Sequence, residues 1–140
     1  MTVSESIINW LKTFKPEEYQ NMKSIQTDMH PATEYSYSLA KEPTQNVKSF
    51  ISGKKIITGY YTIHARLPSQ DNASRKENVA WGEALEKWIV EKNEKKQFPE
   101  IEGATVNKIA VTTPFYMGTS ATNDSLYQLT VSINYVEEKE

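Results

Sequence analysis

The first hydrophobic pattern in the chain has the three- and four-residue spacing of an amphipathic helix. Its apolar members are Val3, Ile7, Ile8, Leu11 and Phe14. Thr2 and Glu5 have the spacing of a capping box, in which each side chain accepts a hydrogen bond from the backbone N–H of the other residue. Pro16 disfavours helical geometry in the residue before it. We therefore predict a helix that starts after Thr2 and ends at about Lys15.

The clearest strand in the first half of the chain is an alternating stretch over residues 56–67. Its odd positions are apolar or small: Ile57, Gly59, Tyr61, Ile63, Ala65 and Leu67. Its even positions are polar or amphipathic: Thr58, Tyr60, Thr62, His64 and Arg66. Because successive side chains of a strand point to opposite faces, we expect one buried face and one solvated face. His64 is expected on the solvated face.

Short extended pieces are predicted between the first helix and this strand. They cover residues 22–28 and residues 35–39, and residues 47–51 are a short strand or a turn. Pro31 and Pro43 separate these pieces.

A second helix is predicted over residues 73–96, with Asp71 or Asn72 as its N-cap. Its apolar to amphipathic stripe consists of Val79, Trp81, Leu85, Trp88, Ile89 and Lys92. Pro99 follows the helical pattern.

The last third of the chain reads as two strands joined by a long loop. The strands are expected over residues 105–113 and 126–136, and the second has the strongest alternation in the chain. The loop begins with the apolar segment 114–118 and continues with polar residues. Residues 137–140 are expected to form a frayed acidic tail.

Two helices and about four to six strands, without regular strand–helix alternation, predict an α+β fold. We expect a mainly antiparallel sheet with both helices packed on it. A length of 140 residues fits a single domain over residues 1–140.

Composition narrows the classes of function. The chain has no cysteine, which excludes disulfides, thiol nucleophiles and cysteine-based metal sites. A net charge of −2 argues against a dedicated nucleic-acid-binding protein. No apolar run approaches the length of a membrane helix, and no secretory signal is expected. These features favour a soluble intracellular domain or a component of an assembly.

The sequence offers few groups for catalysis. His30 and His64 are the two histidines, and they do not have the spacing of metal ligands. No glycine-rich phosphate-binding motif is present. We therefore expect no catalytic, cofactor-binding or metal-binding residues. An alternative is a small-ligand-binding or enzymatic domain that uses Tyr60, His64 and Arg66 on one strand face.

Aromatic residues occur where a small core does not need all of them, and such residues are enriched at protein–protein contacts. We predict subunit contacts in residues 41–55 and in the loop of residues 114–124, with the first helix as a possible third contact. The candidate assembly residues are Trp10, Lys54, Lys55, Phe115, Tyr116, Met117 and Asp124. For Phe115 and Tyr116 the alternative is that both close the edge of the core.

Four stretches of the chain, in order, resemble the tail-terminator or minor capsid (tail-completion) proteins of long-tailed bacteriophages of Gram-positive bacteria. They are residues 6–11, residues 37–43 followed by 50–53, residues 85–93 running on to Phe98 and Pro99, and residues 127–131 with Ile133 and Tyr135. The resemblance spans nearly the whole chain.

This resemblance implies a structural role in the virion, at the junction of head and tail. Tail terminators form a homo-hexameric ring on the head-proximal end of the tail tube and stop its polymerisation. The expected partners are further copies of the chain, the major tail tube protein and the head-completion protein. No membrane and no specific nucleic acid are expected as partners, although DNA can pass through the ring lumen. Assembly would take place in the bacterial host cytoplasm. A non-ring adaptor remains an alternative.

Overall fold

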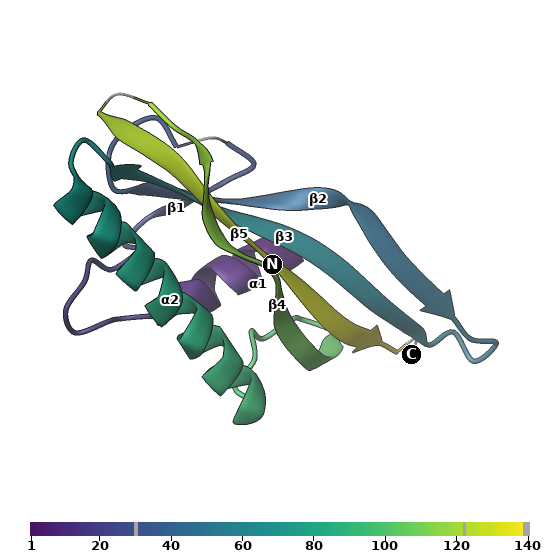
Figure 1. Cartoon of the computed structure of the whole chain (residues 1–140). Coiled ribbons are helices and arrows are strands. Elements are labelled where there is room, and N and C mark those ends of the chain that lie inside the picture. The colour runs from purple at the N-terminus through teal and green to yellow at the C-terminus, as the bar shows by residue number, and fades with distance from the viewer. Residues whose placement is uncertain (30, 122, 139–140) are drawn as a thin grey trace.

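The computed structural model describes residues 1–29, 31–121 and 123–138. Within them the elements are α1 (Val3–Leu11), β1 (Ile25–Thr27), β2 (Ser36–Ser49), β3 (Lys55–Pro68), α2 (Asn72–Glu94), β4 (Ala104–Thr119) and β5 (Asp124–Glu137). The strands form one sheet in the order β1-β2-β3-β5-β4 (Figure 1). Only β1 and β2 pair in parallel, and the other three pairings are antiparallel. The predicted α+β fold with a mainly antiparallel sheet is confirmed.

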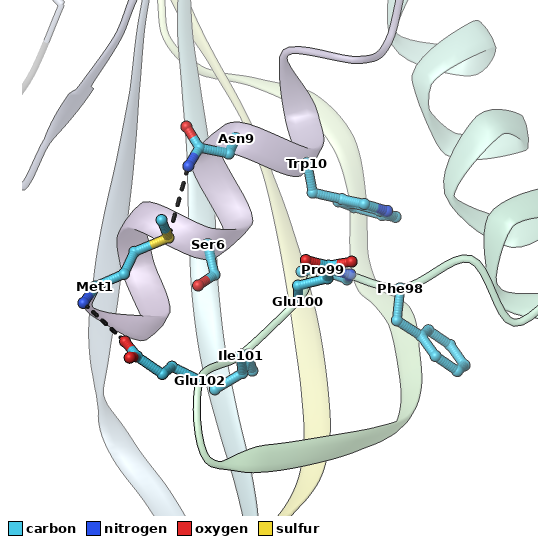
Figure 2. Close-up of a pocket in the computed structure, with 9 residues that line it drawn as sticks. All are labelled: Met1, Ser6, Asn9, Trp10, Phe98, Pro99, Glu100, Ile101 and Glu102. Carbon is cyan, nitrogen blue, oxygen red and sulfur yellow. Dashed lines mark hydrogen bonds and ion pairs between the residues drawn. The ribbon is translucent and has the colours of Figure 1, made fainter.

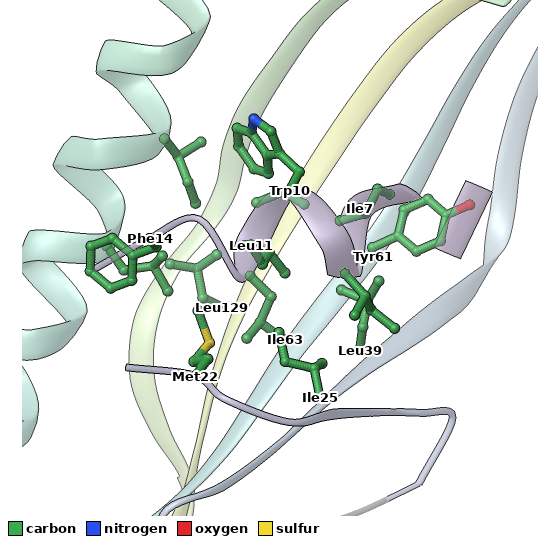
Figure 3. Close-up of a cluster of buried hydrophobic side chains, with 14 of the residues drawn as sticks. Ile7, Trp10, Leu11, Phe14, Met22, Ile25, Leu39, Tyr61, Ile63 and Leu129 are labelled. Atoms are coloured by element: carbon green, nitrogen blue, oxygen red, sulfur yellow. The ribbon is translucent and has the colours of Figure 1, made fainter. Parts of the chain in front are cut away.

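The core lies between the sheet and the two helices. The odd positions of β3 face this core, as predicted, and Ile63 is completely buried. Figure 3 shows α1 packed over the sheet, with Ile7 and Leu11 directed toward Leu39 and Ile63. From α2, the completely buried side chains are Trp81, Leu85 and Ile89. Burial of these apolar surfaces is the main force that holds the helices on the sheet.

Local signals at the helix starts are confirmed. The Thr2 hydroxyl accepts a hydrogen bond from Glu5 N at 3.1 Å, and Thr2 N donates to the Glu5 carboxylate at 3.2 Å. Asp71 is the N-cap of α2 and accepts from Ser74 N at 2.8 Å. This hydrogen bond to the carboxylate lowers the pKa of Asp71.

Two features of the helices differ from the predictions: the residue at which α1 ends and the width of the apolar face of α2. Helix α1 ends at Leu11, before the predicted Lys15, but Phe14 in the following turn is still buried. Val79 is 51 % exposed on α2, so the predicted apolar stripe is too wide at this position.

Strand β2 is one long strand rather than two short pieces. Its pairing with β3 is irregular between Lys41 and Gln45, around Pro43. Proline has no N–H to donate, and strands accommodate it at bulges and on edges. Strand β1 pairs only with Tyr37–Leu39 of β2. The outer edge of β2 beyond these residues therefore has no strand neighbour within the described part of the chain.

The predicted long loop after residue 113 is wrong. Strand β4 continues to Thr119, and only residues 120–123 connect it to β5. Pro114 lies where the β4–β5 register shifts, between Thr113 and Tyr116. It is tolerated there because β4 is an edge strand with a bulge.

The prediction of a frayed tail over residues 137–140 is wrong for Glu137. Glu137 is the last residue of β5 and pairs with Lys55 of β3 and Ala104 of β4. Residues 139–140 of the predicted tail lie outside the described residues.

Candidate assembly interface

The most prominent surface feature is the arm, which we define as residues 41–55. It consists of the end of β2, the start of β3 and the turn between them, and it extends past both helices (Figure 1). Val47 is 51 % exposed, Phe50 is 40 % exposed and Ile51 is fully exposed. The arm therefore presents apolar side chains that the core of this chain does not cover.

The arm is also basic. The ammonium groups of Lys48 and Lys54 lie 5.7 Å and 5.9 Å from the centre of the Phe50 ring, within the range of cation–π attraction. No aspartate or glutamate occurs in residues 43–70. The arm itself contains one acidic residue, Glu42, and Glu137 of β5 pairs opposite Lys55. The predicted candidates Lys54 and Lys55 both lie in this arm.

A groove of about 420 Å³ lies between α2 and β4. Its lining residues are Glu83, Glu86, Lys87, Val90, Glu91, Glu94 and Val111. Four glutamates face one lysine in this lining, so the groove is acidic. We call it the α2–β4 groove.

The floor of the α2–β4 groove is apolar, and part of its charge is already engaged. Val90 is 51 % exposed there. The Glu86 carboxylate accepts a hydrogen bond from Phe115 N at 2.8 Å, and Glu91 forms an ion pair with Lys95 at 3.1 Å. Glu83 and Glu94 are both exposed. The groove thus combines apolar surface with carboxylates, a combination that suits a basic and apolar partner.

Two of the predicted interface residues in β4 pack against the core. The Phe115 ring lies 5.5 Å from the Trp81 ring and 5.2 Å from the Tyr127 ring, centre to centre. Met117 pairs with Tyr127 and is partly buried against the core. The alternative that Phe115 closes the edge of the core is therefore confirmed.

Tyr116 lies on the opposite face of the sheet. It is 45 % exposed, and its hydroxyl accepts a hydrogen bond from Gln128 Nε2 at 2.6 Å. It does not close the core.

Trp10 is not an exposed interface residue. It is 8 % exposed, its indole N–H donates to Gln97 O at 2.8 Å, and its ring centre lies 4.5 Å from that of Trp88. The sequence placed it beside the main stripe of α1, but Trp88 and the segment after α2 cover that side. Asp124 is partly buried and pairs with Arg66 at 2.7 Å.

The face of the sheet opposite the helices is polar, but His64 is not solvated there. His64 is 8 % exposed, although the alternating pattern of residues 56–67 predicts that it lies on the solvated face. It lies between Ser38 of β2 and Gln128 of β5. Next to it, Arg66 Nε donates to Pro31 O at 2.5 Å and anchors the segment that precedes β2. His30 lies outside the described residues.

Tyr60, His64 and Arg66 share one strand face but do not converge. Along a strand each residue advances about 3.3 Å, so Arg66 lies about 20 Å from Tyr60. Arg66 is held by Asp124 and Pro31. Tyr60 instead lines a shallow polar hollow with Thr62 and other side chains. This arrangement does not support a site built from these three residues.

That polar hollow has a volume of about 440 Å³. The Thr62 hydroxyl donates to the Glu42 carboxylate and lies 3.0 Å from the Thr130 hydroxyl. Its polar groups are therefore partly satisfied by one another.

A second cavity, of about 620 Å³, lies between α1 and the segment of residues 98–102 (Figure 2). The amino-terminal ammonium of Met1 pairs with Glu102 at 3.2 Å across its mouth. Asn9 Nδ2 lies 3.6 Å from the Met1 sulfur. These contacts close one side of the cavity and present no nucleophile–base pair.

Comparisons with known proteins add no relative. No protein-family model matches the chain, and no curated protein matches it. In the described residues, no helix is both long and apolar enough to cross a membrane. The same residues contain no cluster of three or more histidine, aspartate or glutamate side chains that could hold a metal ion.

Of the two surfaces described above, the arm lies in the predicted contact segment 41–55, whereas the α2–β4 groove was not predicted. The prediction for residues 41–55 rests on the length of this segment and on the expected exposure of aromatic residues. The groove was not predicted, because Val111, the strand residue that completes it, comes later in the chain than the glutamates of α2. The missing signal was the contrast between the glutamate-rich α2 and the acid-free residues 43–70.

Proposed function

We propose that this chain is a structural assembly protein that forms a ring with copies of itself, of the tail-terminator type. The observation that carries the proposal is the arm, whose exposed Val47, Phe50 and Ile51 have no partner surface in their own core. Contiguous exposed apolar side chains are typical of protein–protein contacts.

The distribution of surfaces supports a ring more than a symmetric dimer. A ring requires two different contact surfaces on each copy, which meet head to tail. The arm and the α2–β4 groove differ in shape and in charge. They supply two such surfaces.

The phage role and its partners rest on the sequence resemblance described above. In this role a ring of six copies sits on the head-proximal end of the tail tube, ends tube polymerisation and offers a surface to the head-completion protein. The tail tube protein and the head-completion protein are then the partners beyond the chain itself, and the virion is its final location.

Light scattering over a wide range of protein concentration tests self-assembly, together with negative-stain imaging of the most concentrated sample. We expect closed rings of six copies. Open filaments would contradict closure. A monomer that also fails to bind the ends of purified tail tubes would contradict the proposed function, and a monomer that binds one partner protein would favour the adaptor alternative.

A further inference from the structure

We propose that the arm of one copy docks into the α2–β4 groove of the next copy. The proposal rests on the self-assembly proposed above and names the two surfaces that would form the contact. The occupant of the groove is thus a second copy of this chain, and the docking segment is the turn of the arm around Phe50 and Ile51.

The chemistry of the two surfaces is complementary. The arm presents fully exposed Ile51 and the half-exposed ring of Phe50, flanked by Lys48 and Lys54. The groove presents Val90 and Val111 flanked by glutamates. Docking would cover apolar surface on both sides and place ammonium groups beside carboxylates. Such charge complementarity gives register and specificity to an interface.

The groove has the size of an ordinary ligand-binding cleft. Its volume of about 420 Å³ lies within the range of about 300–1,000 Å³ that is typical of binding clefts. The turn of the arm is narrow, because Phe50 N donates to Lys54 O at 2.9 Å and Gly53 N donates to Phe50 O at 3.0 Å. A tight turn can therefore enter the groove with its side chains already arranged.

The arm cannot reach the groove of its own copy. Figure 1 shows the turn of the arm and α2 at opposite ends of the molecule. The contact therefore needs a second copy, and head-to-tail repetition of such a contact produces a ring when the rotation closes.

Other occupants fit the groove less well. The end of β5 is acidic, with Glu137 and Glu138, and the glutamates of the groove would repel it. Direct pairing of the β2 edge of one copy with the β4 edge of another is interrupted by the bulges at Pro43 and Pro114. Docking of the arm into the groove does not require the β2 edge or the β4 edge to pair regularly with another strand.

Charge reversal on each surface provides the main test. One variant carries Lys54→Glu and Lys55→Glu in the arm, and a second carries Glu83→Lys and Glu94→Lys in the groove. We expect each variant to weaken self-association by about tenfold or more, because like charges then face each other. A third variant with all four changes should recover association to within a few fold of the unchanged protein.

Matched controls carry the same change in net charge at exposed positions outside both surfaces. Lys15→Glu with Lys23→Glu controls for the arm variant, and Glu17→Lys with Glu18→Lys controls for the groove variant; all four residues are exposed. Circular dichroism checks that every variant is folded. Both controls should associate like the unchanged protein.

A crosslink tests the contact independently of its strength. The chain has no cysteine, so single thiols can be placed at will. One variant carries Ile51→Cys and the other carries Val90→Cys, and the two are mixed in air. We expect a disulfide between the two variants in clear excess over the mixture of Ile51→Cys with Asn107→Cys, an exposed position on β4.

The outcomes separate this contact from the proposed function. If the unchanged protein associates but charge reversal has no effect and no excess crosslink forms, the arm docks elsewhere and this inference is wrong while self-assembly stands. If the groove variant alone loses association and the four-change variant does not recover, a different basic partner surface occupies the groove. If no association and no crosslink occur at any concentration, this inference fails. The proposed function then fails as well only if the chain also does not bind the ends of purified tail tubes.

Discussion

Gly82 marks a close approach between α2 and β4. A Cβ atom added there would lie 2.0 Å from a carbon of the Phe115 ring. Because that ring is packed between Trp81 and Tyr127, it has little freedom to move aside. Gly82 is therefore required by packing, and it costs α2 some helix propensity.

Gly82→Ala should destabilise the protein, against the usual trend. In a helix interior, glycine to alanine normally adds about 1 kcal/mol of stability. Here overpacking against Phe115 should reduce the free energy of unfolding by about 1–3 kcal/mol. Urea denaturation monitored by circular dichroism measures the change.

A rescue variant separates the ring contact from other effects at this position. Adding Phe115→Leu to Gly82→Ala should recover part of the loss, because the smaller side chain leaves room for the new methyl group. A stabilising effect of Gly82→Ala alone would show that the approach of Phe115 to α2 is not as close as described.

The raised pKa of Tyr61 predicts that the protein loses stability in alkaline solution. Burial raises the pKa of Tyr61 from 10.0 to about 12. Below pH 10 the phenol is protonated in both the folded and the unfolded chain, so its contribution does not change. Between pH 10 and pH 12 the unfolded chain loses the proton while the folded chain retains it, and the free energy of unfolding falls.

Substitution of the phenol checks this assignment. Relative to Tyr61→Phe, the unchanged protein should lose stability as pH rises from 10 to 12, in denaturant titrations at a series of pH values. Tyr37, whose pKa burial also raises to about 12, should behave in the same way. Tyr116→Phe, which removes an exposed hydroxyl, is the control. Equal pH profiles for Tyr61→Phe and this control would contradict the prediction.

Sequence reasoning succeeded for residues whose partners are close in the chain. The Thr2–Glu5 box and the Asp71 cap are formed within three residues. It failed for His64 and Trp10, which distant segments cover. The residue that covers Trp10, Trp88, is 78 positions away in the sequence, and alternation or helical spacing carries no information about such a neighbour.

Among the elements, the arm is the least supported part of the sheet. Its β2 side has no strand neighbour on the outer edge in the described residues, and neither helix extends over it. By contrast, β3 is flanked by β2 and β5 and carries completely buried side chains such as Ile63 and Leu67. Local stability should therefore differ strongly between the arm and the centre of β3.

Hydrogen exchange measures this difference. In a sample dilute enough to be monomeric, amides of residues 45–50 should exchange much faster than those of residues 61–65, because local opening of the arm exposes little apolar surface. Slower exchange in the arm at high protein concentration would report its burial by another copy. Equal protection of residues 45–50 and residues 61–65 in the dilute sample would contradict the prediction.

Strand lengths were underestimated wherever a proline interrupts an edge strand. Because Pro43 lies between them, residues 35–39 and 47–51 are predicted as separate pieces, whereas β2 is one strand over Ser36–Ser49. The strand predicted over residues 105–113 stops before Pro114, whereas β4 continues to Thr119. Proline does end helices and central strands. An edge strand with a bulge tolerates it, and edge position cannot be read from the strand's own residues.

For the molecule as a whole, the fold class was predictable and the candidate interface only in part. The alternating pattern of residues 56–67 and 126–136 identified the two central strands, because burial on one face of a sheet imposes that pattern. The α2–β4 groove was not predictable, since Glu83 and Val111 meet only after the chain has folded.

One continuous core predicts cooperative unfolding of the molecule. All three tryptophans lie in it or against it: Trp81 is completely buried, and the ring centres of Trp10 and Trp88 lie 4.5 Å apart. Tryptophan fluorescence and far-ultraviolet circular dichroism should therefore give the same urea midpoint. Separate midpoints would show that the expected single domain over residues 1–140 is wrong.

The place of β5 in the sheet has a consequence for the order of synthesis. Strand β5 follows all other strands in the chain, yet it lies between β3 and β4 in the sheet. Strand β4 pairs with β5 alone, so it has no partner while it leaves the ribosome. The pairing of β3 with β5 joins residues such as Ile63 and Leu129, 66 positions apart. Such distant pairing is slow to form, and until it forms the β3 edge that pairs with β5 keeps unpaired backbone N–H and C=O groups, which are open to chaperones and to other nascent chains.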